Sequence, residues 1–542
     1  MKRTIRMLLC PAVLMLFLIV AAACSSETSS ESEEQTDTNN ENQQEESEDI
    51  SEGGTVTVAY DADPPTLDWM SSDSSATTIV SYHIFEQLFT LDEELTVQPM
   101  LAEDYEISDD GKVYTISLRS DVTFHDGSIM EAEDVVASLN RWGSISGIGM
   151  EVFSRVSEVK EVDESTVQII LDEPYGPLLS TMANIQAAQA VIPAEIAEAA
   201  GESPIEDDQL IGTGPFQFES WNRGDHITIK KFDDYVSREE TDWGGLTGQK
   251  EALVDTVEFY VVSDAQVRID GIRTGQYDYG IRIPQDLYEQ LETDPSLELY
   301  PNSPDSWLTL VPDKSEPPFD NVKLRQALNY ALDREEIGMA TYGHPDFYQV
   351  DGAVFFPEQE DLYTTEGTEP YYEHNIEKAK ELMEEAGYNG EPLKIIGTNS
   401  YDDHYNSGQI ELEQLKKAGF NVEIQTYEWA TYLENVEDPD NFDLFVTGFP
   451  VANDVSSLLW TSPSFPGWWE SERMEEINEE WLESSHDPEV REKLLVELNE
   501  LLYEDVPLLK IVNEVGLEVG SPQLQDYKPW LSMRFWNVGI AE

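Results

Sequence analysis

The sequence predicts an α/β fold divided into more than one domain, and two observations support this prediction. The chain has 542 residues, which is too long for a single hydrophobic core, so two or three domains are expected. In the second half, apolar strand-like runs alternate with amphipathic helical patterns, an order typical of a sheet with right-handed helical crossovers. Hydrophobic residues make up 40% of the chain and aromatic residues 10%, which suits a well-packed globular protein.

The first half of the folded region predicts strands joined by tight turns. Residues 54–60 form the first expected strand. Asp110-Gly111 marks a turn, because glycine accepts the positive φ that such a turn demands, and a strand with period-2 alternation follows at 113–119. Ser128 and Glu131 have the spacing of a capping box, so a helix with an apolar face is expected to start there and to reach Trp142.

The second half predicts the alternation of helices and strands on which the fold class depends. The run 317–334 is predicted to be an N-capped amphipathic helix with an apolar stripe. A further helix is expected to end at Gly387. The other expected elements are a helix at 264–274, a strand at 393–397, a helix at 409–418, strands at 422–427 and 442–447, two helices within 474–503 and a late strand from 506.

Residues 1–23 have the pattern of a signal peptide. A short basic region precedes an apolar run at 8–23, which is shorter than the ~20 residues that span a bilayer. Small residues directly before Cys24 resemble the cleavage site of a lipoprotein, in which Cys24 would carry a lipid. The alternative is a secreted protein with an incidental cysteine. Because Cys10 lies in the removed segment, no disulfide within the mature chain is expected.

The chain is strongly acidic, with a formal charge of −79 at pH 7. Such a surface repels nucleic acid and anionic lipid, so neither is expected as a partner. Residues 25–52 hold eleven acidic residues and no basic one, so the segment 24–52 is predicted to be a disordered tether behind the lipid anchor. Since salt screens self-repulsion, we interpret the charge as a sign of a saline habitat.

No motif for catalysis or for a cofactor is present in the sequence. It lacks G-x-S-x-G, H-E-x-x-H, C-x-x-C and a Walker loop. The glycine-rich run Ile211–Phe216 is followed by a strand pattern rather than a helix, so we interpret it as a structural crossover and not as a phosphate loop. The acidic run 438–443 lacks the glycine of a calcium loop. We therefore expect no enzyme activity, no cofactor and no metal.

Several short sequence motifs, taken in their order along the chain, resemble those of the family-5 solute-binding proteins of ABC importers, the oligopeptide, dipeptide and nickel group. They are the stretch 106–142, Phe85-Glu86-Gln87-Leu88, the run 211–216 and the run 317–334. The resemblance covers residues 55–539 and implies a periplasmic-binding-protein-like fold: two α/β lobes joined by a hinge, with an extra domain inserted in the first lobe. The implied ranges are 53–70, 205–300 and 505–542 for lobe I, 71–204 for the inserted domain and 301–504 for lobe II.

The resemblance also implies a ligand groove, in which peptide-binding members hold the α-amine with an Asp and, in some, the carboxylate with an Arg. The expected Asp falls at Ala452, so the nearest acid is Asp454, and the expected Arg falls in a region that carries Asp402, Asp403 and His404. A zwitterionic dipeptide is therefore less well supported than a longer peptide, a cationic ligand or a neutral one. The candidate ligand-binding residues are Asp68, Trp307, Tyr401, Tyr405, Trp429, Phe449 and Asp454; the alternative is that most of the aromatic ones are core residues.

The function that these observations predict is binding without chemistry. We expect a monomeric, extracytoplasmic receptor, anchored to the outer face of the cell membrane through Cys24. It would bind a di- or oligopeptide by hinge closure and deliver it to the permease subunits of an ABC importer. One alternative keeps the fold but changes the solute to an oligosaccharide or a metal chelate. The other is a secreted hydrolase, which the missing nucleophile and metal motifs disfavour.

Overall fold

The computed structural model of the protein describes residues 50–241, 243–484 and 487–541. The predicted signal peptide, Cys24 and the acidic tether up to residue 49 lie outside the described residues. Ile50–Glu542 form one compact unit. Within the described ranges, none of the helices combines the length and the hydropathy needed to cross a membrane.

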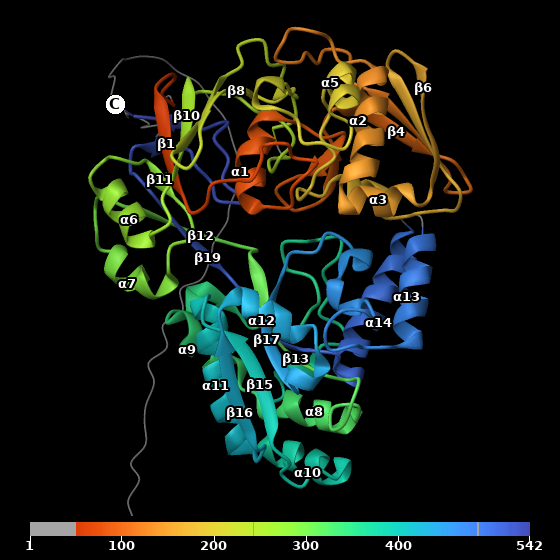
Figure 1. The fold of residues 1–542 in the computed structure, drawn as a ribbon, viewed down its shortest axis with the longest axis vertical. Helices are drawn as coiled ribbons and strands as arrows, with labels where there is room; N and C mark the ends of the chain where they lie inside the picture. The colour runs from red at the N-terminus through yellow and green to blue at the C-terminus, as the bar shows by residue number, and fades with distance from the viewer. Residues whose placement is uncertain (1–49, 242, 485–486, 542) are drawn as a thin grey trace, which may run out of the picture. The chain divides into compact units, whose positions relative to one another are not determined.

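Seven strands form the first large sheet, in the order β12-β19-β11-β1-β10-β9-β8 (Figure 1). Its centre is parallel, because β1 pairs with both β10 and β11. Helix α6 (Ala265–Arg273) begins at Asp264, whose side chain accepts a hydrogen bond from the Val267 backbone, and it packs on β11 and β19. The strands are β1 (Thr55–Tyr60), β8 (Phe216–Asn222), β9 (His226–Lys231), β10 (Thr256–Val261), β11 (Tyr279–Gly280), β12 (Glu298–Asn302) and β19 (Gly516–Gly520).

Between β1 and β8 the chain builds a separate four-stranded antiparallel sheet, ordered β4-β5-β7-β6. The predicted tight turn between β4 and β5 is confirmed, with Gly111 at a φ of 68°. Helix α2 packs against β6 and β7. The elements of this region are α1 (Ser75–Ile84), β2 (Phe89–Leu91), β3 (Val97–Pro99), β4 (Ala102–Ile107), β5 (Val113–Leu118), α2 (Ala132–Ile145), α3 (Gly147–Phe153), β6 (Val156–Asp163), β7 (Thr166–Leu171), α4 (Leu178–Met182) and α5 (Ala194–Ala200).

The capping box of α2 is not the one that the sequence suggested. Glu131 is the N-cap, and the Asp134 side chain accepts a hydrogen bond of 2.9 Å from its backbone nitrogen. Ser128 instead donates its hydroxyl to Asp126 at 2.6 Å, within the preceding turn. The prediction of Ser128 and Glu131 was therefore wrong by three residues, because an Asp two residues before Ser128 holds that hydroxyl in the turn.

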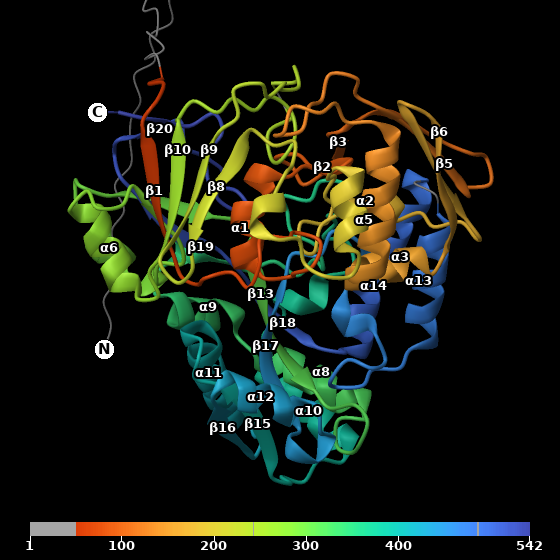
Figure 2. The same cartoon turned by 45° about the horizontal axis from the view of Figure 1, so that its top comes forward.

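Six strands form the second large sheet, in the order β14-β18-β13-β17-β15-β16. Helix α9 packs on β18 and helix α11 on β15, β16 and β17 (Figures 1 and 2). The elements are β13 (Ser306–Pro312), α8 (Val322–Ala331), α9 (Arg334–Tyr342), β14 (Tyr348–Gln349), α10 (Ile376–Ala386), β15 (Leu393–Thr398), α11 (Asp402–Ala418), β16 (Val422–Tyr427), α12 (Trp429–Val436), β17 (Leu444–Pro450), α13 (Glu472–Glu483), α14 (Pro488–Asp505) and β18 (Leu509–Glu514). Most of the expected helices and strands here are present within a few residues; α11 begins earlier than predicted.

The chain passes between the two large sheets at two places. One passage joins β12 to β13 through residues 303–305, and the other joins β18 to β19 through Val515. These are the hinge connections of a two-lobed α/β protein. Although 505–542 was expected in lobe I, β18 is a strand of the second sheet, so the chain re-enters the first sheet only at Gly516.

The buried apolar side chains form three cores, one of which crosses the hinge. One continuous core fills the space between the seven-stranded and the four-stranded sheet. A second core covers one face of the six-stranded sheet and continues to α6 and β19, and a third covers the opposite face with α13 and α14. Since the four-stranded sheet shares its core with the first sheet, the inserted region should move with the first lobe when the hinge bends.

Candidate functional site

A cavity of about 300 Å³ lies between the two lobes, beside the hinge connections. The first lobe contributes α1, the residues that follow β11 and the start of β19, and the second lobe contributes the loop after β17. The polar residues of the lining include Arg282, Asn302, Asp305, Asn453 and Glu518. A cavity of this size with convergent polar groups, shared by two hinged lobes, is typical of a small-molecule binding site.

The hinge connections place carboxylates at this cavity. Asp305 lies in the β12–β13 connection, and its Oδ2 is 3.0 Å from the position that a Cβ on Gly516 would occupy. Glu514 ends β18, and its carboxylate accepts a hydrogen bond of 2.7 Å from Ser306 and one of 3.1 Å from Gln285. Asp403, in the first turn of α11, pairs with His404 at 2.8 Å. Acidic groups from three elements thus gather at the hinge.

The mutual proximity of these acids changes their pKa values. Desolvation raises the pKa of Asp305, although part of the side chain reaches solvent; Arg282 opposes this and Asp403 adds to it. Desolvation and the charges of Asp305 and Asp403 raise the pKa of Glu514 well above its usual range. Burial opposes ionisation of Asp403, but the hydrogen bond from His404 leaves its pKa below the ordinary value. The hinge region therefore carries negative charge at a cost in electrostatic energy.

Arg282 is the positively charged residue of the cavity lining among the described residues. Its guanidinium donates to Asp61 at 3.2 Å and to Ser75 at 2.9 Å. Arg282 has a φ of 50°, in the left-handed region that a non-glycine residue adopts rarely. Because Arg282 is already paired with Asp61 on the first lobe, it neutralises Asp305 only in part.

Two buried carboxylates, Glu518 in the cavity lining and Glu411 on α11, hold protons more tightly than usual. Burial raises the pKa of each to about 7 from an ordinary 4.5. Glu518 accepts hydrogen bonds from Tyr279 and Tyr527, and Glu411 accepts one from Ser407 at 2.5 Å. A carboxyl that is protonated more readily in the folded state stabilises the fold below its unfolded pKa, and this contribution is lost as the pH rises through the folded pKa.

We expect Glu411→Gln, which mimics the protonated carboxyl, to match the parent protein in stability near pH 4.5 and to exceed it at pH 8. The parent must ionise a buried group between about pH 4.5 and 7, and a shift of this size is worth on the order of 3 kcal/mol. Urea unfolding followed at several pH values measures the difference. Glu413→Gln, an exposed change on the same helix, is the control, and equal pH profiles for all three proteins would contradict the prediction.

Direct contacts join the two lobes away from the hinge. The Gly176 backbone donates to the Leu482 carbonyl at 2.8 Å. The Ser180 hydroxyl on α4 donates to Asp454 Oδ2 at 3.2 Å. The neighbours of Ser180 in α4, Leu178 and Leu179, belong to the first core, and Val455, next to Asp454, belongs to the third, so this structure shows the lobes touching across the cleft.

The two acidic residues predicted to bind ligand are both engaged within the protein. Asp454 is 3% exposed, and besides Ser180 its carboxylate accepts from the Trp481 indole at 2.8 Å and caps the turn at Ser456. Asp68 is 2% exposed and forms a bidentate ion pair with Arg141. Neither lines the cavity between the lobes; Asn453, the neighbour of Asp454, does.

The predicted aromatic residues divide into two groups. Trp307 and Phe449 lie in the second lobe's core, with ring centroids 5.5 Å apart. Tyr401 and Trp429 meet at 5.1 Å on the surface near the start of α11 and α12, where Tyr405 is also exposed. None of the five lines the described cavity, and a ligand role for the exposed Tyr401 and Tyr405 and the partly buried Trp429 stays a prediction. The residues that sequence reasoning missed are Arg282, Asn302, Asp305 and Glu518; of these, Asn302 and Asp305 belong to a hinge connection.

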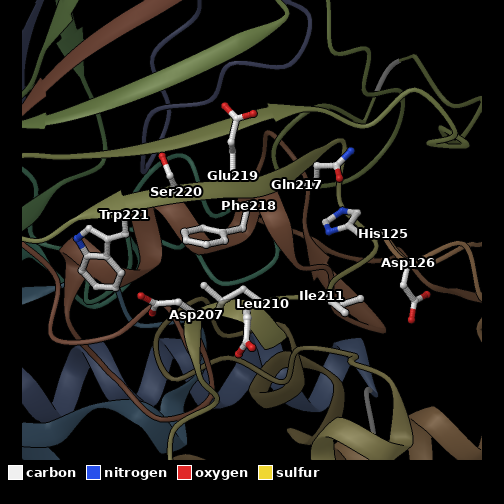
Figure 3. A pocket seen from close by; sticks show the side chains of 11 residues that line it. His125, Asp126, Asp207, Leu210, Ile211, Gln217, Phe218, Glu219, Ser220 and Trp221 are labelled. Atoms are coloured by element: carbon white, nitrogen blue, oxygen red, sulfur yellow. The ribbon is translucent and has the colours of Figure 1, made fainter.

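A second, more open hollow lies on the first lobe alone (Figure 3). The rings of Phe218 and Trp221 point from β8 towards Leu210, and the Trp221 indole donates to Asp63 at 3.1 Å. His125 contacts the backbone of the glycine-rich run, whose chain continues as strand β8, so the prediction of a structural crossover is confirmed. Since the lining carries several carboxylates and belongs to one lobe, hinge closure would not enclose a ligand there.

Two lobes, two hinge connections and a cavity between them define a hinged ligand-binding protein. The chain belongs to the bacterial extracellular solute-binding proteins of family 5, whose model matches residues 96–468. This family consists of substrate-binding transport proteins and not of enzymes.

Similar proteins agree with this assignment over nearly the whole chain. A probable peptide ABC transporter periplasmic-binding protein of Sinorhizobium fredii is 29% identical over 84% of this chain and 88% of its own. The glutathione-binding protein GsiB of Salmonella typhi is 25% identical over 87% and 91%. DppA of Helicobacter pylori, solved with the peptide STSA, shares the fold with a TM-score of 0.72 at 23% identity, covering 91% of this chain and 99% of that one.

Proposed function

We propose that this protein is the lipid-anchored receptor of an ABC importer, which encloses a peptide between its lobes and delivers it to the permease. The cavity that both lobes line at the hinge is the observation that carries this proposal. A ligand there contacts both lobes, so it favours the closed arrangement by differential affinity. The peptide ligand is supported by the Sinorhizobium relative and by the Helicobacter structure, which are a probable peptide-binding protein and a peptide complex.

The nature of the solute can be tested on the protein as purified. We expect mass spectrometry of the ligand released by denaturation to find a peptide, and its re-addition to raise the melting temperature. Release of an oligosaccharide or a metal chelate would be consistent with a hinged receptor but would contradict the proposal that its ligand is a peptide. Turnover of added peptides by the purified protein would contradict the binding function itself.

Membrane attachment through Cys24 is a separate prediction. We expect Cys24→Ser to move the protein from the membrane fraction to the soluble fraction of expressing cells, because the hydroxyl cannot carry the thioether-linked lipid. Cys10→Ser, inside the predicted signal peptide, is the control and should leave the protein with the membrane. Fractionation and immunoblotting measure the distribution, and membrane retention of Cys24→Ser would contradict the lipid anchor.

The acidic composition predicts a salt-dependent fold. With a formal charge of −79, self-repulsion is weakened as the screening length falls from about 10 Å at 0.1 M salt to about 3 Å at 1 M. We expect the melting temperature to rise over this range of KCl. Sucrose at matched osmolality is the control for effects unrelated to charge. A melting temperature that falls with added KCl would argue against adaptation to a saline habitat.

A further inference from the structure

The hinge side of the cavity presents hydrogen-bond acceptors that the protein leaves without donors. Asn302 lines the cavity and is 8% exposed, and its Oδ1 has no partner among the described residues. Asp305, three residues later in the same connection, also lines the cavity, and within the described chain its carboxylate has charge interactions but no hydrogen-bond donor. A buried acceptor without a donor costs free energy, so a ligand N–H would be favoured at Asn302, whereas Asp305 is exposed and offers a charged acceptor.

Most of the ionisable side chains around these acceptors are carboxyl groups. The carboxyl group of Glu514 is close enough to Asp305 for their charges to interact. It accepts a hydrogen bond from Ser306, which follows Asp305 in the chain. Asp403 comes from α11 and Glu518 from β19, so acids of both lobes contribute. Against them stand Arg282, which is paired with Asp61, and His404, which contacts Asp403. The Tyr342 hydroxyl is a second buried group without a described partner, and it lies within the field of Asp305, Asp403 and Glu514.

We propose that the cleft selects a solute with a cationic nitrogen, an ammonium or a guanidinium, and that this nitrogen lies against Asp305 and Asn302 at the hinge. This inference rests on the proposed function and specifies the chemical class of its ligand. A cation supplies a donor for the unpartnered Asn302 oxygen and positive charge for the clustered carboxyl groups around Asp305. Because Asp305 belongs to the connection that must bend and Asn302 ends the strand before it, the same contact links recognition of the charge to closure of the lobes.

The proposal is tested with three short peptide amides that differ in the presence and position of a cation. Trialanine amide carries an α-ammonium, acetyl-Ala-Lys-Ala amide carries a side-chain ammonium, and acetyl-trialanine amide carries none. We expect at least one cationic peptide to bind the full chain ten-fold or more tightly than the neutral one, by calorimetry in ~1 M KCl, where long-range attraction to the acidic surface is screened. Asp305→Asn should remove this preference.

Two further variants separate the site from general charge and from folding defects. Asp109→Asn removes an exposed carboxylate in the β4–β5 turn and should change the preference less than two-fold. Glu514→Gln retains an oxygen for Ser306 and should lower the preference, so the proposal does not depend on one variant remaining folded.

Each outcome decides a different question. Equal binding of all three peptides would overturn the cation site and leave the peptide receptor standing. A preference that Asp305→Asn and Glu514→Gln both retain would also overturn it. Binding of none of the peptides would overturn the inference together with the proposed peptide ligand.

Discussion

Asp454→Ala is expected to destabilise the protein by about 3–5 kcal/mol, the cost typical of breaking a buried charge pair. The Asp454 carboxylate lies 3.5 Å from the Arg491 guanidinium and receives the indole N–H of Trp481, a residue that is 0% exposed. Removal of the carboxylate leaves that indole without this acceptor and removes the cap of the following turn. Urea unfolding followed by tryptophan fluorescence measures the loss.

A ligand role for Asp454 makes the opposite prediction. Were Asp454 the group that binds an amine, Asp454→Asn would abolish peptide binding while the unfolding midpoint stayed unchanged, and that result would contradict our assignment. Ser180→Ala is the matched control, because it removes the hydrogen bond between the lobes and keeps the contacts of Asp454 within the second lobe. It should cost no more than about 1 kcal/mol in stability.

The contrast between Asp454 and Asp305 shows how far the sequence can be interpreted. Periodicity, turn residues and caps are local signals, and they predicted the β4–β5 turn, an N-capped helix at α8 and the end of α10 at Gly387. The choice of Asp454 rested on its closeness in sequence to an expected acid. Sequence distance does not report that Trp481 and Ser180 surround that carboxylate, since both come from distant segments.

Asp305 and Asn302 had no local signal at all. They lie in a connection whose chemistry depends on what the second hinge passage, about two hundred residues later, brings beside it: Glu514 and Gly516. The sequence did place the usual charged anchors in doubt, because Ala452 stands where an Asp was expected, and Asp402, Asp403 and His404 occupy the region where an Arg was expected. It could not indicate that acids from three elements would meet, because that meeting is a property of the tertiary fold.

Glu86 joins two of the family motifs that lie far apart in the sequence, the run 85–88 and the run 211–216. Its carboxylate accepts from Thr213 of the glycine-rich run at 3.0 Å, from Tyr235 at 2.8 Å and from Lys250 at 2.9 Å. The side chains of Glu86 and Lys250 are each 2% exposed. The predicted crossover at 211–216 therefore has a second role, because it presents a hydroxyl to a charge buried under the first sheet.

We expect Glu86→Leu to lower the free energy of unfolding by about 3–5 kcal/mol, because it leaves the Lys250 ammonium buried without its counter-charge and two hydroxyls without an acceptor. Lys250→Met should have a similar cost, since it leaves the buried Glu86 carboxylate without its counter-charge. The double variant Glu86→Gln with Lys250→Met removes both charges and keeps an amide oxygen for Thr213 and Tyr235. It should therefore be more stable than Lys250→Met alone. The single variant Glu86→Gln completes the double-mutant cycle with Lys250→Met, and urea unfolding of these proteins measures the interaction. Additive losses in that cycle, or a loss below about 1 kcal/mol for Glu86→Leu, would mean that the pair is screened by water and does not stabilise the first lobe in the way its burial indicates.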